Sequence, residues 1–267
     1  MSQEEEEKII LIAGGSYAPP HLGHLNTWCK AADAIKIANP RANIKIVVCP
    51  VGDIYDKASV KLFNYELRKE LLSLLKQTRQ DYNIEISDIN KELQHDTYNE
   101  IKLIHKEHGI KPYVIFGADN MIGALTTWKL PTDELILLLK DNTFVVSCST
   151  DQNDKRGSCT DVETLFNNKK KPLNISSNLY TFTVERKYSN MSSSEIIKAL
   201  KLLSSSSENI KALELLNSTI PYIMENQDLL DQLLRLLRLT SQVKDGGRPR
   251  KRKTSKKRKT SRKRKNI

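Results

Sequence analysis

The sequence predicts an α/β protein in which a parallel sheet is flanked by helices on both faces and followed by a C-terminal helical segment. Two observations support this fold class. Short apolar, β-branched runs alternate with stretches of helical periodicity, and Gly or Pro follows several of these runs. Hydrophobic residues make up 39% of the 267 residues, which is enough to form the core of one large α/β domain or of two small ones.

The first half of the chain begins with an apolar strand that ends at Gly14-Gly15. The helix after it is closed by the breaker Asn39-Pro40, and the second strand stops at Pro50. Leucines at helical spacing predict the next helix, and a short apolar strand follows it. The expected strands of this half are 9–13, 44–49 and 83–86, and the expected helices are 22–38 and 65–78.

The second half continues the alternation. Gly109 stops a helix, Gly117 ends a buried strand, and the last strand alternates apolar and polar residues. Apolar residues at helical spacing then persist almost to the C-terminus, with one serine-rich break. The expected strands of this half are 113–116, 143–148 and 179–184, and the expected helices are 96–108, 192–203 and further segments to about 239.

The positive charge of the chain is concentrated at its C-terminus. Residues 244–267 hold 14 of the 43 Lys and Arg residues, while the other 243 residues hold 29 basic and 31 acidic ones. A low-complexity sequence of this kind has little to bury, so it predicts a disordered basic tail over 241–267. We expect an acidic extension over 1–8 and a folded domain over 9–240, with a mobile polar insertion over 149–178.

Composition excludes several classes of protein. No apolar run approaches the roughly 20 residues that span a bilayer, so no membrane partner is expected. The acidic N-terminus lacks the basic region of a secretory signal. The four cysteines show neither C-x-x-C spacing nor histidines at zinc spacing. They are predicted to be buried or incidental thiols in a reducing compartment.

The first strand runs directly into G-G-S-Y-A-P-P-H-L-G-H over 14–24. Glycines at the end of a strand let a ligand approach the backbone, and the free N–H groups of the following helix suit phosphate. His21 and His24 share one face of the first helical turn and can donate hydrogen bonds to phosphate oxygens in a transition state. Alone, the glycines would be a tight turn and the histidines helix caps. Their combination in this order favours a nucleotide site.

This segment resembles the G-x-F-x-P-x-H-x-G-H signature of nucleotidylyltransferases with a Rossmann-like core. The resemblance implies that His21 and His24 are the catalytic residues and that His24, Gly15 and Ser16 contact ATP. Because the same superfamily includes pantetheine-phosphate adenylyltransferases and cytidylyltransferases, this motif implies the type of reaction and leaves the substrate open.

A second segment, P-V-G-D-I-Y-D-K over 50–57, resembles a stretch of the eukaryotic nicotinamide/nicotinate mononucleotide adenylyltransferases. In that family the lysine that matches Lys57 contacts phosphate, whereas a lone lysine here would be an ordinary surface residue. A cation beyond the carboxyl end of a strand can neutralise phosphate. The resemblance also implies that Gly15, Ser16 and Tyr17 contact the pyridine nucleotide.

A third segment, Gly117-Ala118-Asp119 followed by Trp128, is similar to the G-A-D…L-W segment of this family. The resemblance implies that Gly117 and Asp119 hold the adenosine ribose and that Trp128 stacks on the pyridine ring, although Trp128 taken alone is equally well a core aromatic residue. Thr97 matches the threonine that hydrogen bonds to the carboxamide or carboxylate of the ring. The second aromatic residue of the family is missing near Gln94, so stacking is one-sided unless Tyr98 substitutes.

The fourth segment, N-M-S-S-S-E-I-I-K over 190–198, resembles the I-S-S-T-x-I-R motif that binds the β- and γ-phosphates of ATP. Serines at a helix start are first of all N-caps, and their order after the other three motifs favours function. The family arginine falls on Ile197, an apolar residue. Its candidate replacements are Lys198, Arg186 and Lys187. The implied contacts are Ser192, Ser193, Ser194 and Lys198 with ATP, and Ser189 with the pyridine nucleotide.

Together these segments imply adenylyl transfer from ATP to nicotinamide or nicotinate mononucleotide, which gives NAD or its deamido form and pyrophosphate. Mg²⁺ is the expected cofactor and would be held mainly by the ATP phosphates instead of a protein cage. The family commonly forms homo-oligomers. The basic tail suggests an import receptor or another polyanion contact, so we expect an intracellular protein, nuclear or cytoplasmic.

Two other functions remain open. One is adenylyl or cytidylyl transfer to another small substrate on the same core. The other is a nucleotide-binding protein of low activity with a tail that binds nucleic acid, which the loss of the arginine at Ile197 would suit. The tail has no aromatic residues for base stacking.

Overall fold

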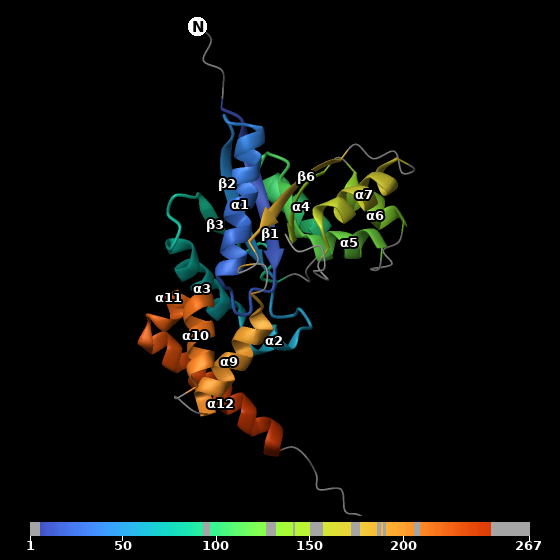
Figure 1. Ribbon diagram of the computed structural model, residues 1–267. Coiled ribbons are helices and arrows are strands. Elements are labelled where there is room, and N and C mark those ends of the chain that lie inside the picture. Colours follow the sequence, from blue (N-terminus) through green and yellow to red (C-terminus); the bar gives the residue numbers. More distant parts are fainter. Residues whose placement is uncertain are drawn as a thin grey trace, which may run out of the picture.

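A six-stranded sheet in the order β3-β2-β1-β4-β5-β6 forms the centre of the computed structural model, and every neighbouring pair of strands is parallel. Figure 1 shows it flanked by helices. The strands are β1 (Lys8–Gly15), β2 (Asn43–Pro50), β3 (Ile84–Ile86), β4 (Tyr113–Gly117), β5 (Thr143–Ser149) and β6 (Asn178–Val184). The structure describes residues 6–92, 97–126, 132–140, 142–149, 157–171, 177–185, 188, 191–205 and 209–246. The expected α/β sheet is confirmed.

Strand β1 divides the hydrophobic core into two layers. Ile9 and Leu11 belong to one buried cluster, and Ile10 and Ile12 belong to the other, because successive side chains of a strand point to opposite faces. The first layer includes the helices Leu22–Ala38 and Tyr65–Gln77 and the C-terminal helices. The second includes the helices Thr97–His108, Ala118–Thr126, Thr132–Leu139 and Cys159–Lys170. Both faces of the sheet are therefore covered, as expected for parallel strands.

The helices that precede the C-terminal segment are α1 (Leu22–Ala38), α2 (Ala58–Leu62), α3 (Tyr65–Gln77), α4 (Thr97–His108), α5 (Ala118–Thr126), α6 (Thr132–Leu139) and α7 (Cys159–Lys170). The C-terminal segment contains α9 (Ser193–Ser205), α10 (Ile210–Thr219), α11 (Pro221–Met224) and α12 (Gln227–Gly246). Figure 1 shows this segment beyond the end of the sheet, next to α2 and α3. Helix α11 contacts α3, and α12 contacts α2.

Three expectations need correction. The polar stretch 149–178 contains α7, whose Val162 and Phe166 are buried in the second core layer. Helix α12 continues to Gly246, so the first residues of the expected tail are helical, while 247–267 and the acidic residues 1–5 lie outside the described residues. Cys148 and Cys159 form a disulfide instead of staying as thiols, because the end of β5 and the start of α7 bring their Cα atoms to 5.3 Å. Cys29 and Cys49 are free and buried.

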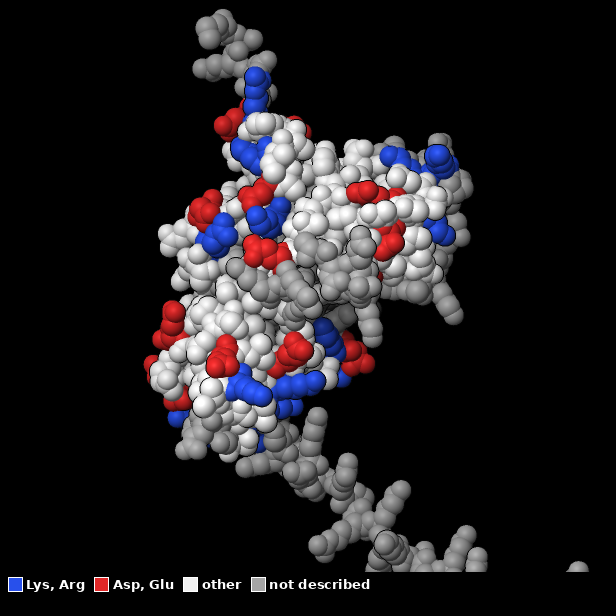
Figure 2. Space-filling model, in the orientation of Figure 1, with Lys and Arg blue, Asp and Glu red and all other residues white. Residues whose placement is uncertain are grey.

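Charges of both signs are mixed on the face of the molecule in Figure 2, where blue and red side chains alternate over the described residues. This agrees with the near-neutral composition outside the tail. Within the described part of the chain, no helix has both the length and the apolarity needed to cross a bilayer.

Candidate active site

The four motif segments meet at the carboxyl end of the sheet. Strands β1 and β4 are neighbours there. The sheet continues with β2 and β3 on the other side of β1 and with β5 and β6 on the other side of β4, and such a switch point leaves a crevice for ligands. A cleft of about 620 Å³ opens at this place. The predicted site residues that line it are Gly15, Ser16, Tyr17, His21, His24, Lys57, Thr97, Gly117, Asp119, Ser192, Ser193 and Ser194.

His21 and His24 lie at the start of α1 with their rings stacked at a centroid distance of 3.7 Å. The backbone N–H of His21 donates to Nδ1 of His24 over 3.2 Å. Burial lowers the pKa of His21 to about 3. Burial also lowers the pKa of His24, and the neighbouring His21 and Lys57 add to this effect. Both rings are therefore neutral near pH 7 and act as hydrogen-bond donors or acceptors instead of cations.

Gly23, between the histidines, serves the packing of the chain. A Cβ atom built there would lie 2.8 Å from the backbone oxygen of Tyr188 and 2.9 Å from Nδ1 of His21. A larger residue at this position would therefore collide with the chain itself, and the backbone of Gly23 also lines the cleft.

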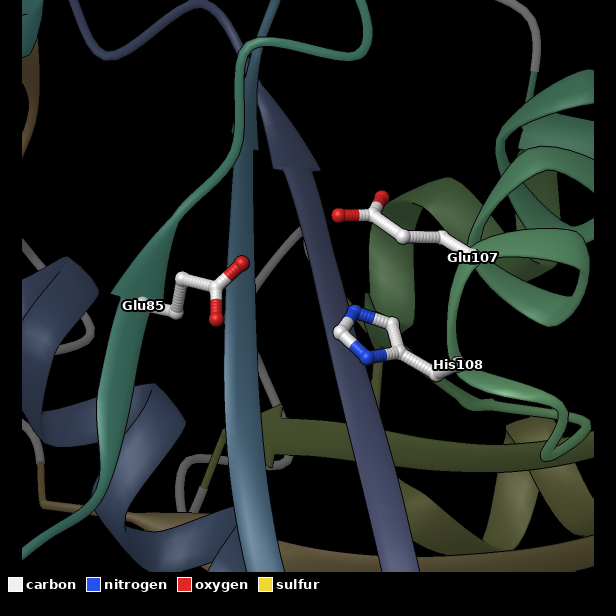
Figure 3. Close-up of side chains that lie close together, drawn as sticks. All are labelled: Glu85, Glu107 and His108. Carbon is white, nitrogen blue, oxygen red and sulfur yellow. The ribbon is translucent and has the colours of Figure 1, made fainter.

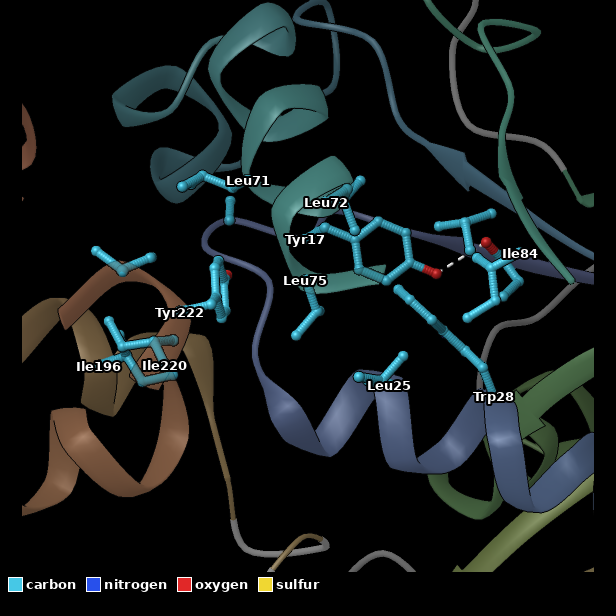
Figure 4. Close-up of a cluster of buried hydrophobic side chains, with 14 of the residues drawn as sticks. Tyr17, Leu25, Trp28, Leu71, Leu72, Leu75, Ile84, Ile196, Ile220 and Tyr222 are labelled. Atoms are coloured by element: carbon cyan, nitrogen blue, oxygen red, sulfur yellow. Dashed lines mark hydrogen bonds between the residues drawn. The ribbon is translucent and has the colours of Figure 1, made fainter. Parts of the chain in front are cut away.

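Tyr17 packs against His24 and supports the part of the cleft that contains the two histidines. Its side chain is buried, its hydroxyl donates to the Ala13 carbonyl over 2.8 Å, and its ring makes edge contacts with His24 and Trp28. Figure 4 shows Tyr17 among the apolar side chains of α1 and α3. Its backbone has φ of 45°, a left-handed conformation that a bulky residue rarely adopts. Tyr17 therefore fixes the bend after β1 that brings His21 and His24 to the cleft.

Lys57 and Arg68 connect the first two motif segments. Lys57 Nζ donates to Ser16 Oγ over 3.0 Å, and Lys57 is the one lysine or arginine among the described residues that line the cleft. The Arg68 side chain is fully buried behind these loops. It donates to the carbonyls of Phe63, Ser16 and Val51 over 2.7–3.0 Å and pairs with Asp53 at 3.0 Å.

The sequence prediction missed Arg68. Burial lowers its pKa, and the hydrogen bond and charge of Asp53 counteract this effect. One signal was present: Arg68 precedes Leu71, Leu72 and Leu75 by three, four and seven residues, so it lies on the apolar face of α3. A charged residue on such a face needs buried partners, which the two loops supply.

The start of α9 is attached to the same region. Ser193 Oγ donates to the Pro19 carbonyl over 2.8 Å, and Ser192 Oγ accepts from the backbone N–H of Glu195 as a helix cap. The Tyr222 hydroxyl of α11 donates to the Pro20 carbonyl over 2.9 Å. The C-terminal helices thus hold the loop before His21, and Ser192, Ser193 and Ser194 at the start of α9 line the cleft.

Ile197 packs against the first core layer, which explains why an apolar residue is tolerated there. Of its candidate replacements, Lys198 is exposed and does not line the cleft. Arg186 and Lys187 lie outside the described residues, as do Trp128, Ser189 and Gln94.

Two carboxylates line the cleft among the described residues: Asp119, at the start of α5, and Glu100, on α4. Glu100 is 1% exposed and was also missed. It precedes the buried Ile104 by four residues, so it too is a charge on an apolar helix face. Thr97 lies one turn before it on the same helix and lines the cleft as well.

A separate cluster of Glu85, Glu107 and His108 joins β3 to the end of α4 (Figure 3). Its potential ligand atoms lie within 4.8 Å of one another. Glu85 is already paired with Lys45 of β2, and none of the three residues lines the cleft. The candidate active site does not include this cluster.

Comparison with known proteins agrees with this geometry. Residues 12–199 match the model of the cytidylyltransferase-like family. No curated protein matches the chain. Among solved structures, the chain is similar to Plasmodium falciparum nicotinic acid mononucleotide adenylyltransferase complexed with APC, with 16% identity, a TM-score of 0.57, and coverage of 84% of this chain and 98% of that chain. The chain is similar to the same enzyme complexed with NaAD as well, with 16% identity, a TM-score of 0.58, and coverage of 86% of this chain and 95% of that chain. At this identity the likeness shows the fold.

Proposed function

Because this chain belongs to the cytidylyltransferase-like family, we propose that it transfers the adenylyl group of ATP to nicotinamide or nicotinate mononucleotide. The observation that carries the proposal is the convergence of the four motif segments on one cleft at the switch point of the sheet. The solved structures of similar fold are of a nicotinic acid mononucleotide adenylyltransferase, which supports the choice of a pyridine substrate.

In the proposed reaction, a 5′-phosphate oxygen of the mononucleotide attacks the α-phosphorus of ATP. The bond from this phosphorus to the bridging oxygen breaks, and pyrophosphate leaves. No protein nucleophile is required, because positioning and charge stabilisation dominate such reactions. His24 donates a hydrogen bond to the developing charge, and Lys57 neutralises phosphate.

The remaining lining residues would hold the ends of the substrates. The N–H groups and hydroxyls at Ser192–Ser194 suit the β- and γ-phosphates, and the Asp119 carboxylate accepts from ribose hydroxyls. Mg²⁺ would be held by phosphate oxygens and water, since the described lining carboxylates, Glu100 and Asp119, come from different helices. When bound, it would neutralise charge on the phosphates.

The test is pyrophosphate release from ATP with nicotinamide mononucleotide, nicotinate mononucleotide and phosphopantetheine, each repeated with CTP. Turnover of ATP with either pyridine mononucleotide supports the proposal. Turnover only with phosphopantetheine, or only with CTP, would assign the cleft to another reaction of the family. Nucleotide binding without any turnover would assign the chain to the binding proteins.

A further inference from the structure

A buried negative charge lies in the wall of the cleft where the pyridine ring is expected. Glu100 is 1% exposed, and it lines the cleft together with Thr97, three residues earlier on the first turn of α4. Residues at this spacing share one helix face, so both side chains face the same part of the cleft. Thr97 is the residue proposed to bind the carboxamide or carboxylate of the pyridine.

The carboxylate of Glu100 is held in a fixed position. Asn90 Nδ2 donates to Oε1 of Glu100, and the Asn90 side chain is itself buried. The negative charge of Glu100 acts on its surroundings: after burial, it is among the causes that raise the pKa of Tyr17 and of Cys49. Since both histidines of the cleft are held neutral by burial, they do not offset this charge.

The two possible substrates differ by one charge at the group that Thr97 would bind. Nicotinate mononucleotide carries a carboxylate there, and nicotinamide mononucleotide carries an uncharged carboxamide with N–H donors. The start of a helix by itself favours an anion. With Glu100 on the first turn of α4, this end of the helix already has an anion of its own, and a second one would be repelled in a poorly solvated site.

We propose that Glu100 is a specificity-determining residue that makes the cleft select nicotinamide mononucleotide over nicotinate mononucleotide. Its carboxylate repels the acid and accepts a hydrogen bond from the amide, so it discriminates by repulsion as well as by attraction. This inference rests on the proposed function.

The experiment compares kcat/KM for the two mononucleotides at saturating ATP in the full chain, in Glu100→Gln and in the control Glu107→Gln. Glu107 is an exposed glutamate on the same helix outside the cleft lining. The wild type should prefer the amide by about tenfold or more. Glu100→Gln, which keeps the shape and gains a donor, should move the ratio toward the acid by about tenfold. Glu107→Gln should keep the wild-type ratio.

The ratio of the two kcat/KM values cancels a general loss of active enzyme, so a merely structural role for Glu100 would not move it. An equal rate with both substrates in the wild type, a preference for the acid, or an unchanged ratio in Glu100→Gln overturns the assignment and leaves the proposed function standing. Turnover of neither substrate by the wild type overturns both. Should Glu100→Gln fail to fold, calorimetric binding of the two mononucleotides to the wild type decides, and equal affinities overturn the assignment.

Discussion

The backbone N–H of His21 donates to the ring of its neighbour His24 at Nδ1, and this contact determines which nitrogen of His24 carries the proton. A neutral imidazole has one donor and one acceptor nitrogen, so with Nδ1 accepting, the proton is on Nε2. His24 therefore has a defined tautomer in the cleft before any substrate binds. Its Nε2–H is the group we expect to stabilise the transition state.

Replacing His24 tests this donor. His24→Ala should lower kcat about 10²–10³-fold, the scale for losing one transition-state donor, with the fold intact. His24→Gln should retain more activity than His24→Asn, because a glutamine amide N–H reaches the position of Nε2 and an asparagine amide reaches only that of Nδ1. Steady-state pyrophosphate release measures the series, with circular dichroism as the folding control. Wild-type turnover in His24→Ala would remove His24 from the mechanism.

Stability should fall as the pH is lowered below neutrality. Burial lowers the pKa of His21 to about 3 in the folded chain, against about 6.5 when unfolded. Between these values the unfolded chain binds the additional proton, so the contribution of His21 is fully present above pH 6.5 and is lost as the pH falls toward 3. Urea unfolding at pH 7 and pH 5 should show a loss of about 2 kcal/mol from His21 alone. In the His21→Gln variant, the free energy of unfolding should fall by about 2 kcal/mol less between pH 7 and pH 5 than in the wild type. An equal fall in the two proteins would contradict the assignment.

Arg68 should stabilise the two loops mainly through its hydrogen bonds to backbone carbonyls, and less through its ion pair with Asp53. Arg68→Ala leaves the carbonyls of Ser16, Val51 and Phe63 without their donor, and it should cost about 3 kcal/mol or more in the free energy of unfolding. Arg68→Lys should recover only part, because one ammonium cannot reach all four acceptors. The Asp53 side chain is 52% exposed, so Asp53→Asn should cost less than about 1 kcal/mol. Equal losses in Arg68→Ala and Asp53→Asn would show that the ion pair carries the effect.

Gly117→Ala should weaken the binding of ATP more than it lowers the stability of the fold. A Cβ atom at Gly117 would lie 2.6 Å from Oδ1 of Asp119, and the next nearest atom is 3.8 Å away. The carboxylate can rotate away, so the fold should survive while the proposed ribose contact is lost. The expected result is a raised KM for ATP, about tenfold, at a nearly unchanged melting temperature. A rise in the KM for the mononucleotide alone would show that Asp119 contacts the mononucleotide instead of ATP.

Deleting the basic tail should separate catalysis from binding of polyanions. Residues 247–267 follow the last residue of α12, and the described residues that line the cleft all precede them. Turnover by the truncated chain should equal that of the full chain, while retention on heparin should fall steeply with the loss of the lysines and arginines. Nuclear import of a fluorescent fusion, with and without the tail, tests the proposed address signal. Loss of turnover on truncation would give the tail a role in the site.

The sheet could be predicted from the sequence because its strands carry strong local signals. Apolar β-branched runs ending at Gly14, Pro50 and Gly117 predict buried parallel strands, and the positions of the motifs at the ends of these runs predict where the cleft forms. Helix α7 was missed, because its polar surface outweighs Val162 and Phe166 in composition, although these two residues are four apart and face the core together.

The missed site residues depend on contacts between distant segments. Arg68 and Glu100 look like errors in apolar helical faces until the loops that contact them are known. The partner of Cys148 had no signal at all, because a spacing of 11 residues matches no motif and the pairing follows from how α7 packs beside β5. Local patterns thus predict the elements and the place of the cleft, whereas buried charges and cross-links need the tertiary structure.

The loop before His21 is held by residues far along the chain. Ser193 bonds to the Pro19 carbonyl across 174 residues of sequence, and Tyr222 bonds to the Pro20 carbonyl across 202. During synthesis the N-terminal histidine loop leaves the ribosome long before the helices that hold it. A nascent or truncated chain that ends before α11 would contain all four motifs and still lack one of these two anchors. Competence to bind substrate should therefore arise late, when almost the whole folded domain has been made.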